Sequence, residues 1–190
     1  MNYIFFTILG FLSGSTLFAY WIPRLMKGID IRVLPQDHNP GVANAFTYGG
    51  FWPGLLSLIC ELGKGALPIL LSQQFVRVDS LLFVPVMVAP VFGHAFPFFH
   101  HEKGGKAIAV SFGVLIGLCP EVRPLFYLIV FYLLFSLLIV IRPHALRSMI
   151  TFALFTTIVF FRVDTFSIKI GCLCISLIVI AKHLAASQRS

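Results

Sequence analysis

Residues 125–141 read LFYLIVFYLLFSLLIVI, a run of seventeen positions without a charged side chain. A helix that crosses the hydrocarbon core of a bilayer needs about 20 mostly apolar residues. Similar runs recur along the chain of 190 residues, of which 58% are apolar and 11% charged, and the mean hydropathy is +0.95. Soluble domains carry about 25% charged residues. The sequence therefore predicts an all-α integral membrane protein that forms a single domain over residues 1–190.

The apolar runs predict about seven transmembrane helices. The first run lacks the basic residues that open a cleaved signal peptide, so it is predicted to be a membrane helix. The fourth and sixth runs are short for a bilayer of about 30 Å. The seven predicted spans are residues 3–22, 50–71, 80–99, 106–119, 125–141, 149–161 and 166–183.

The distribution of lysine and arginine predicts how the chain is oriented. Nine of these residues fall in the loops after spans one, three and five, in the C-terminal tail or at the span ends that border them, whereas three fall in the opposite loops. Because cytoplasmic loops are enriched in Lys and Arg, we expect the N-terminus outside and the C-terminus in the cytoplasm. The same rule accounts for the formal charge of +7, so we predict no nucleic-acid partner.

The loop after the third span, residues 94–106 (HAFPFFHHEKGGK), concentrates polar chemistry beside the membrane. Gly104 and Gly105 let the backbone approach an anion closely, and Lys106 would stand at the positive end of the next helix. This pattern favours phosphate binding. It is not a nucleotide-binding P-loop, because the GxxxxGK[ST] spacing is absent and Ala107 follows the lysine.

Each histidine in this stretch can be interpreted either as functional or as structural. His94 lies where the third span approaches the cytoplasm and could bind, orient a site or exchange protons there, although a structural role is the alternative. His100, His101 and Glu102 invite a metal-binding interpretation, but adjacent histidines in a loop lack a convincing ligand set. We therefore predict no metal and no cofactor.

The first and third inner loops carry further candidate anion-binding groups. Residues 28–46 (GIDIRVLPQDHNPGVANAF) contain Arg32, whose planar fork suits phosphate, and two amide side chains, Asn39 and Asn44. A solvated loop without a binding role is an equal alternative. Residues 142–148 (RPHALRS) add two arginines, Arg142 and Arg147, and Ser148, for which contact with lipid head groups is an equally good explanation.

Two charged residues lie inside the second span. Glu61 and Lys64 are three residues apart, so they share one face of a helix and can partly neutralise each other. Ionisable residues within a membrane are expensive and face protein or water rather than lipid. The pair is either functional or a structural ion pair.

These motifs together resemble the bacterial acyl-phosphate:glycerol-3-phosphate acyltransferases of the PlsY type. The resemblance is carried by Gly14-Ser15, GIDIR at 28–32, NPG at 39–41 with Asn44, E-x-x-KG at 61–65 and GH-x-FP-x-F…GGK at 93–106. It implies transfer of a fatty acyl group from acyl-phosphate to glycerol 3-phosphate, giving lysophosphatidic acid for phospholipid synthesis. It further implies a multi-pass protein of the bacterial inner membrane that contacts membrane lipids.

The resemblance also implies roles for particular residues. It gives His94 and Lys106 catalytic roles. It gives substrate-binding roles to Arg32, Asn39, Gly41, Asn44, Gly104, Gly105, Arg142, Ser148 and His183.

The chain departs from the family pattern at several of its polar positions. Asp37 stands where the family has a phosphate-facing serine, so an anion would be repelled there, and Thr47 replaces the usual arginine. In the last family motif, H-x-x-N, the histidine corresponds to His183 but Ala186 replaces the asparagine. These departures motivate the alternative of a non-catalytic paralogue that binds lipid or an anionic metabolite, or that partners an active acyltransferase.

Overall fold

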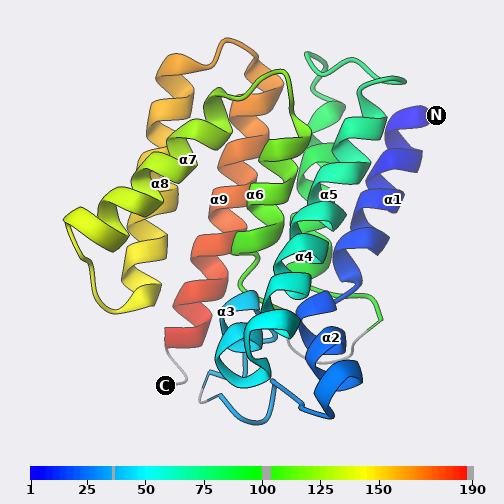
Figure 1. Ribbon diagram of the computed structural model, residues 1–190. Coiled ribbons are helices and arrows are strands. Elements are labelled where there is room, and N and C mark those ends of the chain that lie inside the picture. Colours follow the sequence, from blue (N-terminus) through cyan, green and yellow to red (C-terminus); the bar gives the residue numbers. More distant parts are fainter. Residues whose placement is uncertain (36, 100–103, 188–190) are drawn as a thin grey trace.

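The computed structural model describes residues 1–35, 37–99 and 104–187, and all regular structure in these ranges is helical (Figure 1). This confirms the predicted all-α class. The elements labelled η are short π-helices. In chain order the elements are α1 (Asn2–Ser15), α2 (Phe18–Lys27), α3 (Val42–Asn44), η1 (Ala45–Gly49), α4 (Phe51–Ser72), α5 (Phe83–Ala95), α6 (Ile108–Gly117), α7 (Arg123–Leu133), η2 (Leu134–Leu138), α8 (His144–Arg162) and α9 (Phe166–Ser187).

Within the described ranges, four helical segments are long and apolar enough to cross a membrane. They are Asn2–Lys27, Phe51–Ser72, His144–Arg162 and Phe166–Ser187. Three shorter apolar helices accompany them, Phe83–Ala95, Ile108–Gly117 and Arg123–Leu138. Each of these seven segments overlaps one of the seven predicted spans, whereas seven membrane crossings and the orientation of the termini stay predictions.

The boundaries of two spans differ from the prediction for identifiable reasons. The sixth was expected over 149–161, yet α8 begins at His144 because the polar residues after Pro143 continue the helix beyond the apolar run. The third was expected over 80–99, but α5 ends at Ala95. Phe96 precedes Pro97 and leaves the helical region, with φ −134° and ψ 71°, because a proline disfavours helical geometry in the residue before it.

The first predicted span is broken into two helices. Thr16 and Leu17 leave the helical region, with ψ values of 111° and 78°. A break of this kind leaves backbone groups without helical partners. The charged pair of α4 supplies them: Lys64 Nζ donates to the Thr16 carbonyl at 2.7 Å, and the Ala19 amide donates to Glu61 Oε1 at 3.2 Å.

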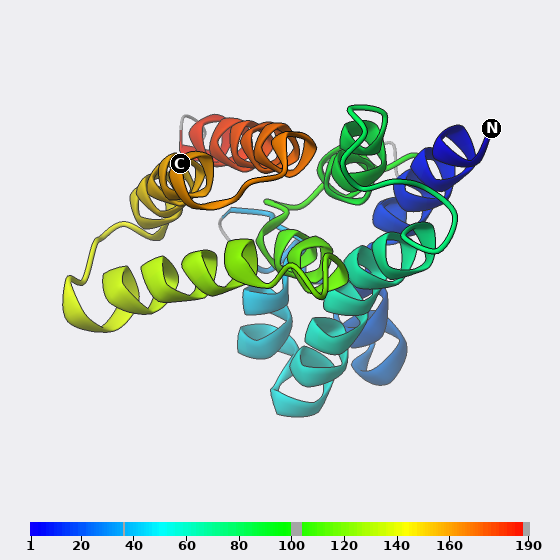
Figure 2. The same cartoon turned by 90° about the horizontal axis from the view of Figure 1, so that it is seen from above.

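The helices form two rows, seen end-on in Figure 2. One row contains α1, α5, α9 and α8, and the other contains α4, α6 and α7. Glycines allow close approach within each row. A Cβ on Gly14 of α1 would lie 2.1 Å from the Pro90 carbonyl oxygen of α5, and one on Gly113 of α6 would lie 2.2 Å from the Leu62 carbonyl oxygen of α4. Small residues of this kind let helices pack closely in membranes, where lipid offers no hydrophobic force between them.

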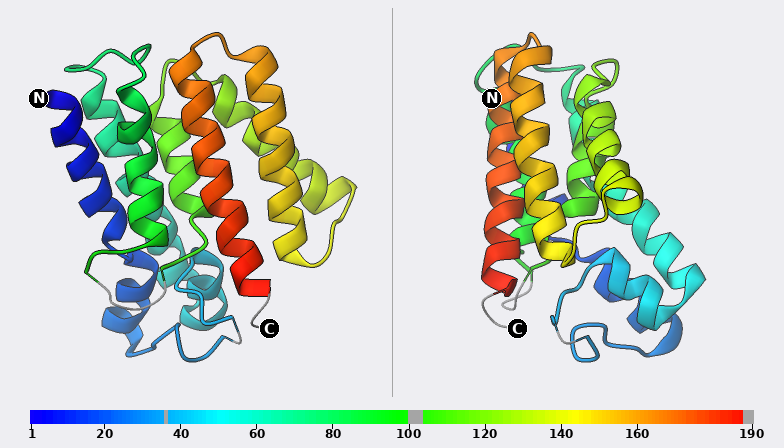
Figure 3. Two further views of the ribbon diagram at one scale, coloured as in Figure 1. Left: turned by 180° about the vertical axis from the view of Figure 1, so that it is seen from behind. Right: turned by 90° about the vertical axis from the view of Figure 1, so that its left-hand side faces the viewer.

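The N-terminus and the C-terminal end of α9 lie at opposite ends of the bundle (Figure 1). The C-terminal end of α9 shares its end of the bundle with α2 and α3, with residues 96–99 after α5 and with residues 104–107 before α6. Side views show α2 and the first turns of α4 extending outward from that end (Figure 3). The three predicted inner loops therefore meet at one end of the molecule.

Candidate functional site

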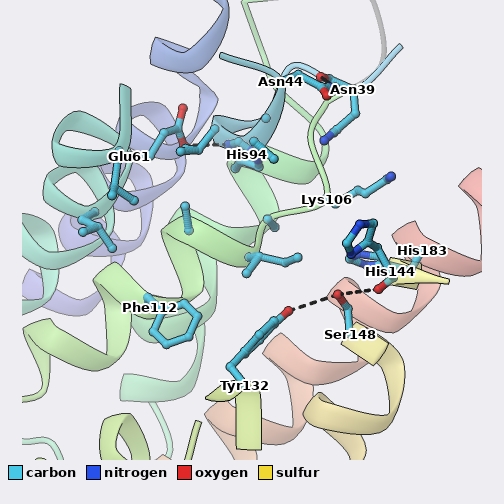
Figure 4. Close-up of a pocket in the computed structure, with 18 of the residues that line it drawn as sticks. Asn39, Asn44, Glu61, His94, Lys106, Phe112, Tyr132, His144, Ser148 and His183 are labelled. Carbon is cyan, nitrogen blue, oxygen red and sulfur yellow. Dashed lines mark hydrogen bonds and ion pairs between the residues drawn. The ribbon is translucent and has the colours of Figure 1, made fainter. Parts of the chain in front are cut away.

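A cavity of about 760 Å³ lies between the two rows of helices at this end (Figure 4). Its polar part is lined by side chains from the first inner loop, from the start of α6 and from the adjoining ends of α8 and α9. These include Asp37, Asn39, Asn44, Lys106, Ser148 and His183. Its apolar part runs along α4, α6 and α7. The cavity therefore combines a polar, charged end with an apolar lining.

The segment before α6 is shaped by two glycines. The Gly105 amide donates to the His94 carbonyl at 3.1 Å, and a Cβ on Gly105 would lie 2.1 Å from His94 Nε2. A Cβ on Gly104 would lie 2.3 Å from the same His94 carbonyl oxygen. Larger residues cannot be accommodated without moving the backbone, so this pair of glycines holds the loop against the end of α5. Ala107 then adopts a left-handed conformation, with φ 62°, directly before α6.

Lys106, delivered to the cavity by this loop, pairs with a carboxylate. Its Nζ lies 2.7 Å from Asp37 Oδ2, and the two side chains are 23% and 36% exposed. Burial alone would raise the pKa of Asp37, but hydrogen bonds from Lys106 and Asn44 outweigh it and hold that pKa below its usual value. Asp37, expected to repel an anion, thus also neutralises the cation that was expected to bind one.

The NPG turn of the first inner loop borders the same polar end. Asn44 Nδ2 donates to Asp37 Oδ1 at 3.0 Å and to the Asn39 carbonyl at 2.8 Å. The Gly41 amide also donates to the Asn39 carbonyl, and a Cβ on Gly41 would lie 2.5 Å from Asn39 Nδ2. The structure therefore brings Asn39, Gly41 and Asn44 together with Lys106.

His94 belongs to a buried polar cluster with the two charged residues of α4. Lys64 Nζ lies 2.8 Å from Glu61 Oε2, and His94 Nδ1 lies 3.1 Å from the same oxygen. Lys64 Nζ is also 2.9 Å from His94 Nδ1. Because Glu61 and His94 both reach the cavity wall, the cluster connects the break between α1 and α2 with the loop that carries Lys106.

Two predicted binding residues from α8 and α9 reach the cavity, and both are buried. Ser148 accepts a hydrogen bond from the Tyr132 hydroxyl at 3.1 Å, and His183 Nδ1 lies 2.8 Å from the Val179 carbonyl. Figure 4 shows Ser148, His183 and Lys106 on the same side of the cavity, with His144 beside His183.

Two arginines that were predicted to bind substrate, Arg32 and Arg142, are not among the described residues that line the cavity. Arg32 makes a two-point contact with Asp30, with Nε–Oδ1 at 3.2 Å and Nη2–Oδ2 at 3.0 Å, and its Cζ lies 3.9 Å from the centre of the Tyr20 ring. The hydrogen bond from Arg32 also lowers the pKa of Asp30. Arg142 is exposed.

Two cavity residues, Tyr132 and His144, were not candidates in the sequence analysis, and Arg147 was a candidate without an assigned binding role. The spacing of His144, Arg147 and Ser148 places them on one face of the first turns of a helix, which could have indicated a shared role. Tyr132 lies within an uninterrupted apolar run, so nothing in the local pattern distinguishes it from a lipid-facing residue.

The apolar wall follows helical periodicity. Ile108, Phe112 and Ile116 recur every four residues along α6 and so extend over about 12 Å. Leu125, Ile129 and Tyr132 of α7 line the same cavity. Ile116 and Ile129 are 38% and 39% exposed, so the groove is open at its side. A hydrocarbon tail fits such a groove.

Among the described residues, no group of three or more His, Cys, Asp or Glu side chains is placed to hold a metal ion. His100, His101 and Glu102, considered above as metal ligands, lie outside the described residues. Lys106 and the donor groups around it are instead suited to an oxyanion.

Comparison with known proteins gives a consistent family. Residues 4–190 match the family description "Glycerol-3-phosphate acyltransferase". A protein of Dehalococcoides mccartyi named glycerol-3-phosphate acyltransferase 2 is 36% identical over 119 residues, which cover 63% of this chain and 56% of that protein. A glycerol-3-phosphate acyltransferase of Maridesulfovibrio salexigens is 34% identical over 134 residues, which cover 70% of this chain and 66% of that protein. The matched region thus spans less than two thirds of each of these relatives.

Two solved structures have a similar fold. Both are crystal structures of PlsY, an integral membrane glycerol 3-phosphate acyltransferase. The glycerol 3-phosphate form superposes with a TM-score of 0.86 at 25% identity, covering 100% of this chain and 92% of that chain. The lysophosphatidic acid form gives a TM-score of 0.84 at 24% identity, covering 100% and 91%. With its apolar helices and its match over almost the whole length, the chain is a membrane protein that belongs to the PlsY family of glycerol-3-phosphate acyltransferases.

Proposed function

We propose that the chain is an acyltransferase that moves a fatty acyl group from acyl-phosphate to glycerol 3-phosphate, giving lysophosphatidic acid and phosphate. The observation that carries the proposal is the position of the Gly104–Lys106 loop, where the polar end of the cavity meets its apolar groove. An acyl-phosphate has the matching form, a phosphate joined to a long hydrocarbon tail. Family membership and the names of the relatives support the same activity.

The reaction needs little from the protein beyond positioning and charge. The acceptor hydroxyl oxygen bonds to the acyl carbonyl carbon, the bond from that carbon to the phosphate oxygen breaks, and the phosphate leaves with the electron pair. The hydroxyl proton passes to the released phosphate. Acyl-phosphate is already activated, so holding both substrates together and stabilising the departing anion provide most of the acceleration.

Within this proposal the cavity residues have distinct roles. Lys106 and the backbone around Gly104 and Gly105 stabilise the donor phosphate. Asn39 and Asn44 shape the acceptor pocket, with Gly41 keeping the turn between them compact. These assignments follow from where the side chains lie around the cavity.

Four further residues complete the assignment. His94 acts as a positioning residue, because it holds the loop that carries Lys106. Ser148 and His183 border the polar end from the opposite side. Arg32 supports the first inner loop through Asp30 instead of contacting substrate.

The proposal includes a location and an orientation. Seven crossings of the bacterial inner membrane, with the N-terminus outside and the C-terminus in the cytoplasm, place the polar end of the cavity on the cytoplasmic side. That side supplies the water-soluble acceptor. The uneven distribution of Lys and Arg between the two sets of loops supports this orientation.

An assay of the purified protein in lipid vesicles tests the proposal. With acyl-phosphate and glycerol 3-phosphate, we expect lysophosphatidic acid and inorganic phosphate in equal amounts. Acyl-CoA in place of acyl-phosphate tests the donor and should give no product. Absence of product with acyl-phosphate, in vesicles where another family member turns over, would reject the proposed activity.

The alternative of a non-catalytic relative is motivated by the ion pair between Asp37 and Lys106, because Lys106 is the cation that was expected to bind phosphate. It is not favoured, because the relatives are named as acyltransferases. Lys106→Ala distinguishes the two in the same assay. If acyl transfer occurs and is lost in Lys106→Ala, the non-catalytic alternative is excluded.

A further inference from the structure

The charges at the cavity do not all have opposite partners. Among the described residues that line the cavity, the fully charged side chains are Asp37, Glu61, Lys106 and Arg147. Lys106 pairs with Asp37, and Glu61 pairs with Lys64. Within the described part of the chain, no carboxylate lies within ion-pair distance of Arg147. Among the described residues of the cavity, Arg147 is therefore the cation without a carboxylate partner, and we expect its charge to be available for an incoming anion.

Arg147 is held so that part of its guanidinium group is buried and unsatisfied. Its Nη2 lies 2.5 Å from His144 Nδ1, one turn earlier on α8. Its Nε is buried and has no hydrogen-bond partner among the described residues. A buried donor without an acceptor is costly unless a ligand supplies one.

The neighbours of Arg147 connect it with the apolar groove. Ser148, the next residue, donates to the His144 carbonyl at 3.1 Å and accepts from the Tyr132 hydroxyl. Tyr132 also lines the groove with the apolar side chains of α7. Arg147 thus lies where the polar end of the cavity meets its apolar groove. The phosphate of an amphiphilic donor is expected at the same place.

We infer that Arg147 binds the phosphate of the acyl donor, beside Lys106 and next to the entrance of the apolar groove. This inference builds on the proposed function and adds a binding residue to it. A guanidinium fork can make two parallel hydrogen bonds to phosphate oxygens, which an ammonium cannot. Because Asp37 neutralises much of the charge of Lys106, the donor phosphate depends on this second cation.

The kinetic test compares four proteins in vesicles: wild type, Arg147→Ala, Arg147→Lys and Arg162→Ala. Arg162 is a matched control, since it is an exposed arginine at the far end of the same helix. We expect Arg147→Ala to raise the KM for acyl-phosphate by about ten- to a hundredfold, the loss expected for a hydrogen bond to a charged group. The KM for glycerol 3-phosphate should change less than twofold.

The conservative variant separates charge from geometry. Arg147→Lys should recover part of the donor KM but not all of it, and Arg162→Ala should behave as wild type. An unchanged donor KM in Arg147→Ala would overturn the inference. Equal increases in both KM values would overturn the assignment to the donor. If Arg147→Ala does not fold, Arg147→Lys decides, and a donor KM equal to that of wild type would reject the role of the fork.

A binding measurement keeps this inference separate from the proposed activity. Inorganic phosphate should raise the thermal unfolding midpoint of detergent-solubilised wild type, because a ligand that binds only the folded state stabilises it. Arg147→Ala and Arg147→Lys should show a smaller increase, and Arg162→Ala the full increase. Phosphate stabilisation that depends on Arg147, in a protein without acyl transfer, would support the site while rejecting the activity. Equal stabilisation of all four proteins would reject the site.

Discussion

Two lysine–carboxylate pairs in this molecule have the same chemistry and opposite surroundings. The Glu61–Lys64 pair is 1% exposed on both sides, and His94 joins it. The Asp37–Lys106 pair is 23% to 36% exposed at the cavity. A buried pair cannot lose a partner without leaving a charge unsolvated, whereas an accessible pair can exchange its partner for water or for a substrate anion. The first is suited to a structural role and the second to binding.

Removing the carboxylate of the buried pair should have the largest effect. Glu61→Gln leaves the Lys64 ammonium without a counter-charge inside the bundle. We expect a loss of about 3–5 kcal/mol in the free energy of unfolding, as for other broken buried pairs. The thermal unfolding midpoint in detergent measures it. Asp79→Asn breaks an exposed pair and should leave the midpoint unchanged. Similar decreases in both variants would contradict a special role for burial.

The contact between the buried cluster and the cavity loop gives a second prediction. In Gly105→Ala the new methyl group would lie 2.1 Å from His94 Nε2, so the loop must shift and Lys106 with it. A displacement of about 1 Å can reduce turnover about a hundredfold, and we expect a loss of that order in kcat for acyl transfer. Gly63→Ala is the control, because a Cβ there meets nothing within 4 Å. Equal activity in the two variants would show that the loop tolerates the displacement.

Breaking the accessible Asp37–Lys106 pair should have a smaller effect, and it should improve substrate binding where the two preceding variants impair the protein. Asp37→Asn removes the negative charge that competes with substrate phosphate for Lys106. We expect KM for acyl-phosphate to fall about two- to fivefold, in line with the strength of exposed ion pairs, with little change in the unfolding midpoint. A higher KM would indicate that Asp37 contributes to substrate binding instead of competing with it.

The smallest expected effect concerns pH: near neutrality, the influence of Asp37 on the KM for acyl-phosphate should not change with pH. Because hydrogen bonds from Lys106 and Asn44 lower the pKa of Asp37 below its ordinary 3.8, its pairing is fully present above that ordinary value. The pairing is lost only as the pH falls through the lowered pKa. The ratio of the KM values of wild type and Asp37→Asn should therefore stay constant from pH 5 to pH 8. An inflection within that range would contradict the assigned charge state.

Local pattern predicted most of the fold and part of the site. Apolar runs located the helical segments, because length and hydropathy are properties of single segments. The break at Thr16 was not predicted, since it depends on Lys64 and Glu61 from another helix to satisfy its backbone groups. Sequence spacing also indicated that Glu61 and Lys64 pair, but not that His94 joins them.

Two arginines illustrate the same limit within the site. Arg32 has the right chemistry for phosphate, yet Asp30 lies two residues away and engages it locally. From the sequence, Arg147 could not be distinguished from an arginine that contacts lipid head groups, because its relevance depends on α7 and α8 lying together at the cavity, which no short-range pattern reports. Residue type indicates which chemistry is possible, and tertiary packing selects the residues that perform it.

The side opening of the groove between α6 and α7 affects how a lipid-like donor would arrive. If the bundle crosses the membrane as proposed, the groove borders the hydrocarbon of the bilayer through Ile116 and Ile129, so the proposed donor can enter by diffusing within the membrane plane and its product can leave the same way. Encounter is then governed by the number of donor molecules per area of membrane. Diluting the vesicle lipid with an inert lipid should slow turnover, while diluting the vesicles in buffer should leave the rate per protein unchanged.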